Sequence, residues 1–372
     1  MNEPIRVLQI IGDVVGGGVE NVIMNYYRYI DKSKIQFDFV VHEGALKTYL
    51  REVKKYGGIV FVIPSYKTNI FKYTYAIYKI IKENKYSIVH SNMNSMSGFP
   101  LMAAYFAGAK IRILHNHTTD SPAEGIRTLL KRILRPFAKL FANQYWACSN
   151  LAAEWMYGKK VVEDNKITII NNAIDIDKFK FDKEKREKIR EKLCLKDCFV
   201  IGHVGRFEQT KNHKFLINVF HKIIKQIPSV KLLLVGDGSL KDEIQLQVEN
   251  LGLKSNVIFC GVRNDVADLY NAMDVFVFPS LYEGLGMAVI EAQVNSLPTI
   301  VSIAIPAEAK ISEYIKFISL QQPLKDWLNE VENAKRKELN ISDELLKKFD
   351  IREESKKLEN LYLKLIKGKS RT

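Results

Sequence analysis

The sequence predicts an α/β protein made of two doubly wound domains with mostly parallel sheets. Short runs rich in β-branched and aromatic residues alternate with longer amphipathic stretches along the whole chain, which is the pattern of βα units. The pattern stops at a charged segment, residues 182–192, and then starts again. With 372 residues, the chain also exceeds the roughly 250 to 300 residues at which single cores stop growing.

The expected elements fall into two series. The first domain should contain seven strands, at residues 5–11, 37–41, 60–63, 88–90, 111–114, 145–147 and 167–170. The second should contain five, at residues 199–204, 231–235, 257–260, 275–278 and 299–301. No Gly/Ser or Pro tract separates the series, so the linker should be short, near residues 172–180, and the domains should face each other across a cleft. Residues 343–367 carry apolar residues mostly three and four apart, which predicts a long amphipathic helical segment broken near Asp350.

Composition and charge exclude several classes of protein. The chain is 47% hydrophobic and 26% charged and has no run of roughly 18 apolar residues, which argues against disorder and against a membrane-spanning protein. Four cysteines without a CxxC pair suit a reducing cytoplasm, and the N-terminal apolar run resembles a strand more than a signal peptide, so we expect a cytoplasmic protein. The net charge is +14, and residues 1–170 hold 23 basic and 13 acidic residues. This basic half is compatible with nucleic acid, an anionic membrane surface or a phosphorylated substrate.

A glycine-rich loop follows the first expected strand. It includes Gly17 and Gly18 and leads directly into a helical pattern. Glycines at a helix N-terminus let backbone amides approach a phosphate or a sugar. The spacing is not GxGxxG, however, and a plain tight turn is an equal alternative.

Two cations follow the first strand of the second domain. Arg206 and Lys211 would both leave the carboxyl end of that strand. A guanidinium fork with an ammonium there would neutralise a diphosphate without a metal. The alternative is two solvated surface cations, and the position after a strand favours the diphosphate.

Two glutamates lie eight residues apart after another apolar strand, in the run Pro279–Ala292. If a helix begins near Gly286, Glu283 lies in the loop before it and Glu291 lies just over one turn inside it. The first amides of that helix would then face an anion or hydroxyl groups. A carboxylate directed into a cleft also accepts hydrogen bonds from ribose hydroxyls. The alternatives are a favourable charge at a helix N-terminus for Glu283 and a solvated position for Glu291.

Polar residues with possible metal-binding or substrate-binding roles occur at two other places. His115 and His117 follow a strand of the first domain, and one of them could meet a substrate hydroxyl. Further metal ligands at a recognisable spacing are lacking, so we expect no metal there. Asp175 and Asp177 form a DxD pair of the kind that holds a metal and a diphosphate. They fall at the expected linker, and we interpret them as polar linker residues.

The segment 127–139 is basic and apolar at helical spacing. Such a segment is typical of a helix on an anionic membrane surface, and a solvated face on a packed helix is the alternative. No zinc-finger spacing, helix-turn-helix signal or RNA-recognition motif supports nucleic-acid binding.

Taken together, these motifs resemble the retaining glycosyltransferases of family 4, and the resemblance runs nearly end to end. Its markers are the glycine loop, His117 with residues 118–120, residues 171–175, Gly205-Arg206 with Lys211-Asn212, residues 235–238, residues 261–263, and the Glu283/Glu291 pair. Residues 305–311 and 317–320 are similar to the branch that builds bacterial exopolysaccharide and capsule. Departures from the family pattern occur at Asn295-Ser296 and at Asn172-Ala173, outside the expected contacts.

The resemblance implies the GT-B architecture of two facing Rossmann-like domains. Residues 1–175 with a returning C-terminal helix, 351–372, would bind the acceptor, and residues 176–350 would bind the nucleotide sugar. It further implies roles for residues that match the family's motifs: Arg206 and Lys211 on the donor diphosphate, Glu291 on the ribose, Val262 at the base, Glu283 with Gly284, Leu285, Gly286 and Met287 at the donor sugar, His117 near the reacting carbon, and Gly17 and Gly18 lining the cleft.

The function implied is a metal-independent, retaining hexosyltransferase. It would use a nucleotide sugar, with uridine favoured by the resemblance, and a lipid-linked or oligosaccharide acceptor at the inner face of the bacterial plasma membrane. Fixed cations beside the departing diphosphate would stabilise the transition state selectively. A sugar-nucleotide epimerase of the same architecture is the main alternative, and a non-catalytic basic membrane- or RNA-binding protein is a third. The sequence leaves open the donor sugar, the acceptor, the linkage, the oligomeric state and the choice between His115 and His117.

Overall fold

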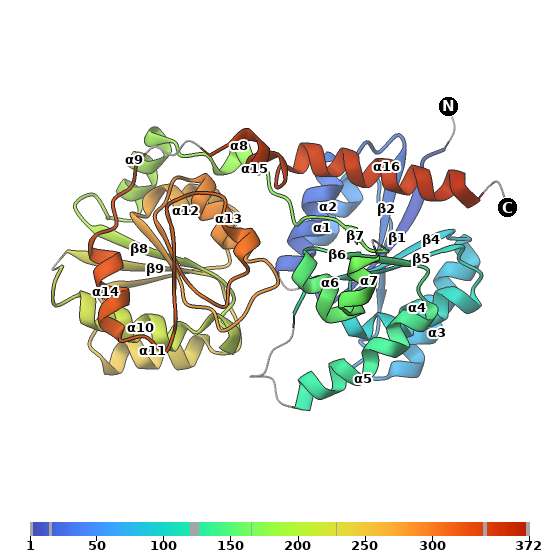
Figure 1. Cartoon of the computed structure of the whole chain (residues 1–372), viewed down its shortest axis with the longest axis horizontal. Coiled ribbons are helices and arrows are strands. Elements are labelled where there is room, and N and C mark those ends of the chain that lie inside the picture. The colour runs from blue at the N-terminus through green and yellow to red at the C-terminus, as the bar shows by residue number, and fades with distance from the viewer. Residues whose placement is uncertain are drawn as a thin grey trace. The chain divides into compact units, whose positions relative to one another are not determined.

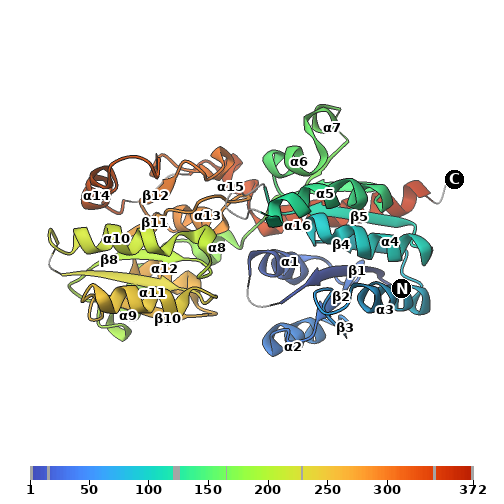
Figure 2. The same ribbon diagram turned by 90° about the horizontal axis from the view of Figure 1, so that it is seen from below.

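The polypeptide folds into two units, each built on one parallel sheet. A computed structural model describes residues 3–14, 17–119, 126–164, 166–227, 229–337 and 341–369. The first unit comprises Met1–Ile174 together with Lys347–Thr372, and the second comprises Asp175–Leu346. Figures 1 and 2 show helices on both sides of each sheet.

The first unit contains seven strands in the order β3-β2-β1-β4-β5-β6-β7. Because the strand order reverses between β1 and β4, that point is where ligands of such sheets bind. Its elements are β1 (Ile5–Gly12), α1 (Gly18–Tyr29), β2 (Ile35–His42), α2 (Lys47–Lys55), β3 (Val60–Ile63), α3 (Ile70–Asn84), β4 (Ile88–Ser91), η1 (Asn94–Ser97), α4 (Gly98–Phe106), β5 (Ile111–Asn116), α5 (Ile126–Phe141), β6 (Gln144–Ala147), α6 (Asn150–Tyr157), α7 (Lys159–Glu163), β7 (Thr168–Ile169) and α16 (Ile351–Lys369).

The second unit repeats this plan with six strands in the order β10-β9-β8-β11-β12-β13. Here the order reverses between β8 and β11. Its elements are α8 (Ile176–Phe179), α9 (Lys183–Lys192), β8 (Phe199–Val204), η3 (Gln209–Lys211), α10 (His213–Ile223), β9 (Val230–Val235), α11 (Lys241–Asn250), β10 (Val257–Gly261), α12 (Val266–Ala272), β11 (Val275–Phe278), α13 (Met287–Val294), β12 (Thr299–Ser302), η4 (Ala307–Ala309), β13 (Ile315–Ile318) and α14 (Leu324–Glu332), with α15 (Asp343–Lys347) at the boundary between the units.

The structure confirms the prediction of two Rossmann-like units and corrects the strand count of the second. The sequence predicts five strands there, whereas β13 is a sixth, at the end of the sheet beside β12. This strand is four residues long, and Lys316 within it is exposed. A short edge strand buries too little of its surface to produce a clear hydrophobic pattern.

The final helix packs on the first unit, as the family resemblance implies. Helix α16 lies beside α1 (Figure 1), and its side chain Tyr362 is fully buried. The expected break near Asp350 is present: the Asp350 carboxylate accepts a hydrogen bond from Arg352 N at 2.9 Å and so caps the new helix. The change of unit occurs after Leu346, four residues earlier than the predicted end of the second domain at residue 350. The reason is a backbone bridge between Ile174 and Asp350, which ties this segment to the first unit.

Each unit has its own core. In the first unit every residue of β2 is buried, and Trp146 is a large fully buried side chain. In the second, Trp327 and Phe276 are fully buried. Strands covered on both faces explain why the sequence shows continuous apolar runs rather than alternation.

Candidate functional site

Two loops meet at the strand-order reversal of the second unit. One follows β8 and ends at Lys211, and the other follows β11 and contains Glu283. The amide of Leu281 donates to the carbonyl of Thr210 at 2.8 Å, which joins the two loops. Because both strands end at the same edge of the sheet, residues 72 positions apart in sequence lie together there.

Lys211 and Glu283 form a close ion pair at this edge. Their side chains are 21% and 12% exposed, so the pair is largely shielded from water. The Glu283 carboxylate also accepts a hydrogen bond from the Ser280 hydroxyl at 2.9 Å, and the Lys211 ammonium lies 5.0 Å from the centre of the Phe278 ring. The structure therefore brings together two of the predicted residues and fixes both carboxylate and ammonium in place.

Arg206 lies in the same loop as Lys211 but contacts a different residue. Its guanidinium pairs with Glu208 at 3.1 Å, and its side chain is 46% exposed. In this arrangement Arg206 is a surface cation beside the buried pair. A guanidinium with this exposure is free to change rotamer at little cost.

The helix predicted near Gly286 begins at Met287, and Gly286 is its N-cap residue. Gly286 has φ +83°, a left-handed conformation that favours glycine. Leu285 beside it is buried and anchors the turn. The first N–H groups of α13 have no partner within the helix, and amides in such a position can bind an anion or hydroxyl groups.

Glu291 lies one turn further along α13 and contacts α12. The hydroxyl of Tyr270 donates to Glu291 Oε2 at 2.9 Å and lies 3.2 Å from the carbonyl oxygen of Ala288. Loss of solvation raises the pKa of Glu291 from its ordinary value of 4.5 to about 7, although Tyr270 and Lys178 favour the charged form. A carboxyl group that titrates near neutrality inside a polar site is a candidate functional group.

Val262, the predicted contact for the base, follows β10 at the carboxyl edge of the sheet. Its side chain is 60% exposed, so its apolar surface faces solvent at this edge. Arg263 and Asp265, which follow it, form an ion pair at 2.6 Å and stiffen this loop.

In the first unit, Gly17 and Gly18 form the start of α1. The amide of Gly17 donates to Glu20 Oε1 at 2.7 Å, and a Cβ at residue 17 would lie 2.9 Å from Glu20 Oε2. The glycine at 17 therefore makes room for a local cap, as the tight-turn alternative expects. Gly18 has open space where a Cβ would be, and residues 15 and 16 lie outside the described part of the chain.

His117 lies just beyond the end of β5, beside the strand-order reversal of the first sheet. Its Nε2 is 3.0 Å from Asn92 Oδ1, and its backbone amide donates to Asn94 Oδ1 at 2.8 Å. Burial lowers the pKa of His117 to about 4, so the ring is neutral at physiological pH. The Asn92 oxygen accepts only, so Nε2 carries the proton and Nδ1 is the acceptor.

A buried hydrogen-bond chain supports this histidine. Gln9 Oε1 accepts from Asn92 Nδ2 at 2.9 Å, and Gln9 Nε2 donates to the Tyr362 hydroxyl at 3.1 Å. That hydroxyl in turn lies 2.6 Å from His90 Nδ1. The chain thus connects the Asn92 amide to the final helix.

The position of the two candidate histidines differs. His115 lies within β5, its ring stacks on that of His117 at 4.0 Å, and its Nδ1 is 3.0 Å from His90 Nε2. His115 is therefore one pleat deeper in the sheet, while His117 stands at the carboxyl end. The sequence reveals neither Asn92 nor Tyr270 as a partner of these groups. For Asn92 the available signal is a polar residue after the end of a strand, which is weak, and Tyr270 lies inside a helix.

The DxD pair has local structural roles. Asp175 accepts from the amide of Lys178 at the start of α8, and Asp177 pairs with Lys180 at 2.7 Å. Within the described residues, no group of three or more His, Cys, Asp or Glu side chains is placed to hold a metal ion. The described helices likewise include none long and apolar enough to cross a membrane.

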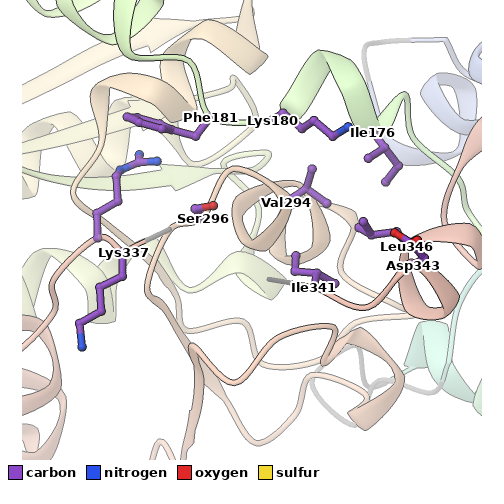
Figure 3. Close-up of a pocket in the computed structure, with 10 residues that line it drawn as sticks. Ile176, Lys180, Phe181, Val294, Ser296, Lys337, Ile341, Asp343 and Leu346 are labelled. Carbon is purple, nitrogen blue, oxygen red and sulfur yellow. The ribbon is translucent and has the colours of Figure 1, made fainter. Parts of the chain in front are cut away.

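A separate pocket of about 630 Å³ lies in the second unit. Its lining residues are Ile176, Lys180, Phe181, Val294, Ser296, Arg336, Lys337, Ile341, Asp343 and Leu346 (Figure 3). Val294 and Ser296 place it at the C-terminal end of α13, whereas the candidate donor loop is at the N-terminal end. The pocket is therefore distinct from the candidate site.

Comparison with known proteins identifies the class. The family model described as Glycosyltransferase Family 4 matches residues 16–178, and the one described as Glycosyl transferases group 1 matches residues 184–316. The crystal structure of Anabaena HepE in complex with UDP and glucose superposes with a TM-score of 0.75 over 95% of this chain and 98% of that one, at 20% identity. The fold and these matches define a glycosyltransferase.

Full-length relatives then identify the family. The glycosyltransferase EpsF of Bacillus subtilis is 33% identical over 88% of this chain and 87% of its own length. A UDP-Gal:α-D-GlcNAc-diphosphoundecaprenol α-1,3-galactosyltransferase of Escherichia coli is 27% identical over 95% of both chains. The capsular polysaccharide biosynthesis glycosyltransferase CapH of Staphylococcus aureus is 24% identical over 96% of this chain and 99% of its own.

The chain belongs to glycosyltransferase family 4, in the branch that contains bacterial exopolysaccharide and capsule enzymes. The relatives named above are transferases, so the epimerase alternative gains no support from them.

Proposed function

We propose that this glycosyltransferase moves a hexose from a UDP-sugar to a lipid-linked or oligosaccharide acceptor, with retention of anomeric configuration and without a metal ion. The observation that carries the proposal is the Lys211–Glu283 pair beside the start of α13, at the strand-order reversal of the second sheet. An ammonium, a carboxylate and a helix N-terminus at one sheet edge match a sugar linked to a diphosphate.

The donor would be held by the second unit. Lys211 would exchange Glu283 for the diphosphate, and Arg206 would turn from Glu208 to the same phosphates. Glu283, released from Lys211, would accept hydrogen bonds from hydroxyls of the hexose, and amides of the segment Gly284–Met287 would donate to hexose oxygens. The ionised Glu291 would accept the ribose hydroxyls, and Val262 would pack against the base.

The reaction needs charge stabilisation at the leaving group. The bond from the anomeric carbon to the diphosphate oxygen breaks, the acceptor oxygen bonds to that carbon from the same face, and the acceptor proton passes to the departing diphosphate. Lys211 and Arg206 would stabilise the growing negative charge without a metal. His117, neutral and acting through Nδ1, would accept a hydroxyl of the hexose, while Gly17 and Gly18 would lie at the same edge of the first sheet.

A lipid-linked acceptor is supported by a relative and by a surface helix. The Escherichia coli relative carries diphosphoundecaprenol in the name of its acceptor. In this chain α5 exposes Leu129, Leu130, Ile133 and Leu140, at 59%, 52%, 63% and 73%, and it has basic but no acidic residues. Such a helix suits the anionic inner surface of the plasma membrane, where the protein would bind peripherally.

Nucleotide binding tests the donor side. Thermal unfolding with UDP, GDP, ADP and NAD in EDTA should show stabilisation by UDP, because a ligand of the native state raises the midpoint by mass action. Lys211→Ala should remove the shift, and Lys214→Ala, an exposed lysine on α10 paired with Glu243, is the matched control. Stabilisation that requires a divalent metal, or that occurs with NAD alone, contradicts the proposal.

Product analysis tests the chemistry. Release of UDP only in the presence of an acceptor, with the donor's anomeric configuration preserved in the product by NMR, is the expected result. An inverted anomeric configuration in the product would refute the retaining mechanism, but it would not contradict the assignment of the donor site.

Vesicle binding tests the membrane side. Charge reversal of Lys131, Arg132 and Lys139 should abolish sedimentation with anionic vesicles, while reversal of Lys183, Lys188 and Lys192 on α9 should not. Arg135 is left unchanged because it contacts the Trp155 carbonyl and ring. Equal binding by both triple variants contradicts a membrane role for α5.

A further inference from the structure

A pocket of about 480 Å³ lies between α3 and α4 of the first unit. Its walls are almost entirely apolar and include Ile70, Phe71, Tyr75, Tyr78, Phe99 and Phe106. Three of these rings reach far into solvent: Phe71 is 83% exposed, Tyr75 66% and Phe106 65%. Contiguous exposed aromatic surface of this kind marks an interaction site.

The pocket extends from the functional edge of the sheet. Helix α3 follows β3 and α4 follows β4, so both helices begin near the carboxyl ends of the strands; Figures 1 and 2 show them side by side. Ile70 and Phe99 lie in the first turns, while Tyr78 and Phe106 lie about 10 to 12 Å further along, at 1.5 Å of rise per residue. A chain lying in the pocket would therefore have one end at the edge where ligands of parallel sheets bind.

The helices around the pocket carry more basic than acidic residues. Helix α3 carries Lys72, Lys79 and Lys82 against one acid, Glu83, and α4 carries no charged residue. Helix α5, which packs on α4, has five basic residues and no acidic one. An apolar pocket on helices with an excess of basic residues is complementary to an amphiphile with a hydrocarbon chain and an anionic head group.

We propose that this pocket binds the hydrocarbon chain of the lipid-linked acceptor, with the anionic head group toward the carboxyl edge of the sheet. The assignment rests on the proposed function for the nature of the acceptor. A concave pocket favours a single chain over a flat bilayer, because a bilayer surface would contact the outward rings without filling the space between the helices. The net positive charge of α3 and α5 disfavours a second copy of this chain, since two such faces would repel each other.

Photo-crosslinking locates the chain directly. The probe is farnesyl phosphate with a diazirine on its terminal isoprene unit, added to the full-length protein in mild detergent without vesicles. Labelled peptides should fall within residues 70–78 and 99–106, and undecaprenyl phosphate should compete whereas inorganic diphosphate should not. Labelling confined to α5, spread evenly over the protein, or insensitive to undecaprenyl phosphate overturns the proposal.

Matched variants separate the pocket from the membrane face. Phe71→Asp with Phe106→Asp should reduce labelling by about tenfold or more, because a carboxylate must be desolvated when the chain enters. Both side chains are exposed, so the variant should keep its thermal midpoint. Leu140→Asp removes an exposed apolar residue from α5 outside the pocket and should label normally, as should Phe71→Leu with Phe106→Leu.

The two proposals fail in different ways. If the double aspartate variant is photo-labelled as strongly as the unmodified protein, the pocket does not bind the hydrocarbon chain, whether or not UDP stabilises the protein. If UDP fails to stabilise the unmodified protein while labelling behaves as expected, the donor assignment fails and the pocket assignment stands.

Discussion

Replacing Glu291 by glutamine should stabilise the protein in a strongly pH-dependent way while weakening nucleotide binding. The substitution keeps the shape of the side chain. Its amide oxygen can still accept the hydrogen bond from the Tyr270 hydroxyl, which lies 2.9 Å from the carboxylate in the unmodified protein. What it removes is the cost of ionising a carboxyl group at a poorly solvated position. Polar groups that serve function at a cost in stability are common in proteins.

The magnitude follows from the pKa of Glu291, which rises from 4.5 to about 7 on folding. Between these two values the native protein binds more protons than the unfolded chain, so stability is lost as the pH rises through this window and is level above it. At 1.36 kcal/mol for each pKa unit, the ionisable glutamate costs about 1 kcal/mol at pH 5 and about 3 kcal/mol at pH 8. Because part of the side chain still meets water, these figures are upper limits.

The assay must follow the second unit alone, since two units need not unfold together. Trp327 is the tryptophan of that unit, and the other two, Trp146 and Trp155, belong to the first. With 5-fluorotryptophan incorporated, the ¹⁹F resonance of Trp327 reports urea unfolding of the second unit, and Trp327→Phe assigns the signal. Unfolding of the unmodified protein and of Glu291→Gln would be compared at pH 5, 6, 7 and 8 without nucleotide.

The expected result is a difference in the free energy of unfolding between the two proteins that grows by about 2 kcal/mol from pH 5 to pH 8. Parallel curves across this range would show that Glu291 titrates at its ordinary pKa, and the reasoning from desolvation would be wrong. A gap that narrows with rising pH would mean that the carboxylate is stabilised by the fold, which the contacts with Tyr270 and Lys178 would then have to explain.

Three further predictions concern nucleotide affinity, the buried histidine and a crowded glycine. If the ionised Glu291 binds ribose, the Kd for UDP should be about tenfold larger at pH 6 than at pH 8, because affinity is lost as the carboxylate is protonated. Calorimetry measures this Kd, and Glu291→Gln should show no such pH effect. Asn92→Ala should lower kcat by about tenfold or more with an unchanged Kd for UDP, since His117 loses its positioning partner. Asn92→Asp should raise the pKa of His117 and so shift the pH profile of kcat. An unchanged pH profile would contradict the positioning role. Gly236→Ala should destabilise the second unit by about 3 kcal/mol or more, because residue 236 has φ +136° and its Cβ would lie 2.1 Å from a backbone oxygen. In the control Gly252→Ala, where φ is +68° with open space around the Cβ, the cost should stay near about 1 kcal/mol.

Much of the fold is readable from local patterns. The two series of βα units, the start of α13 immediately after Gly286 and the break in the C-terminal helical pattern near Asp350 are all predicted, because each depends on residues within a few positions. Strand β13 is missed for the same reason: four residues with one exposed lysine contain too little pattern.

The candidate site divides differently. The types of residue and the strands that they follow indicate that Lys211, Glu283, Glu291 and His117 are functional candidates, and the family resemblance adds roles. The partners of these residues are not predictable, because they come from elsewhere in the chain. Tyr270 reaches Glu291 across 21 positions, and Asn92 reaches His117 across 25.

The sequence alone therefore determines the class of fold, the family and the set of polar residues at the strand ends, since hydrophobic periodicity and motif spacing are local properties. Only the tertiary structure decides which of these residues meet, and with what chemistry. The Lys211–Glu283 ion pair, the neutral state of His117 and the raised pKa of Glu291 arise from solvent exclusion and from contacts between distant elements. The pocket between α3 and α4 exists for a related reason, because its walls belong to two helices joined through a strand of the sheet.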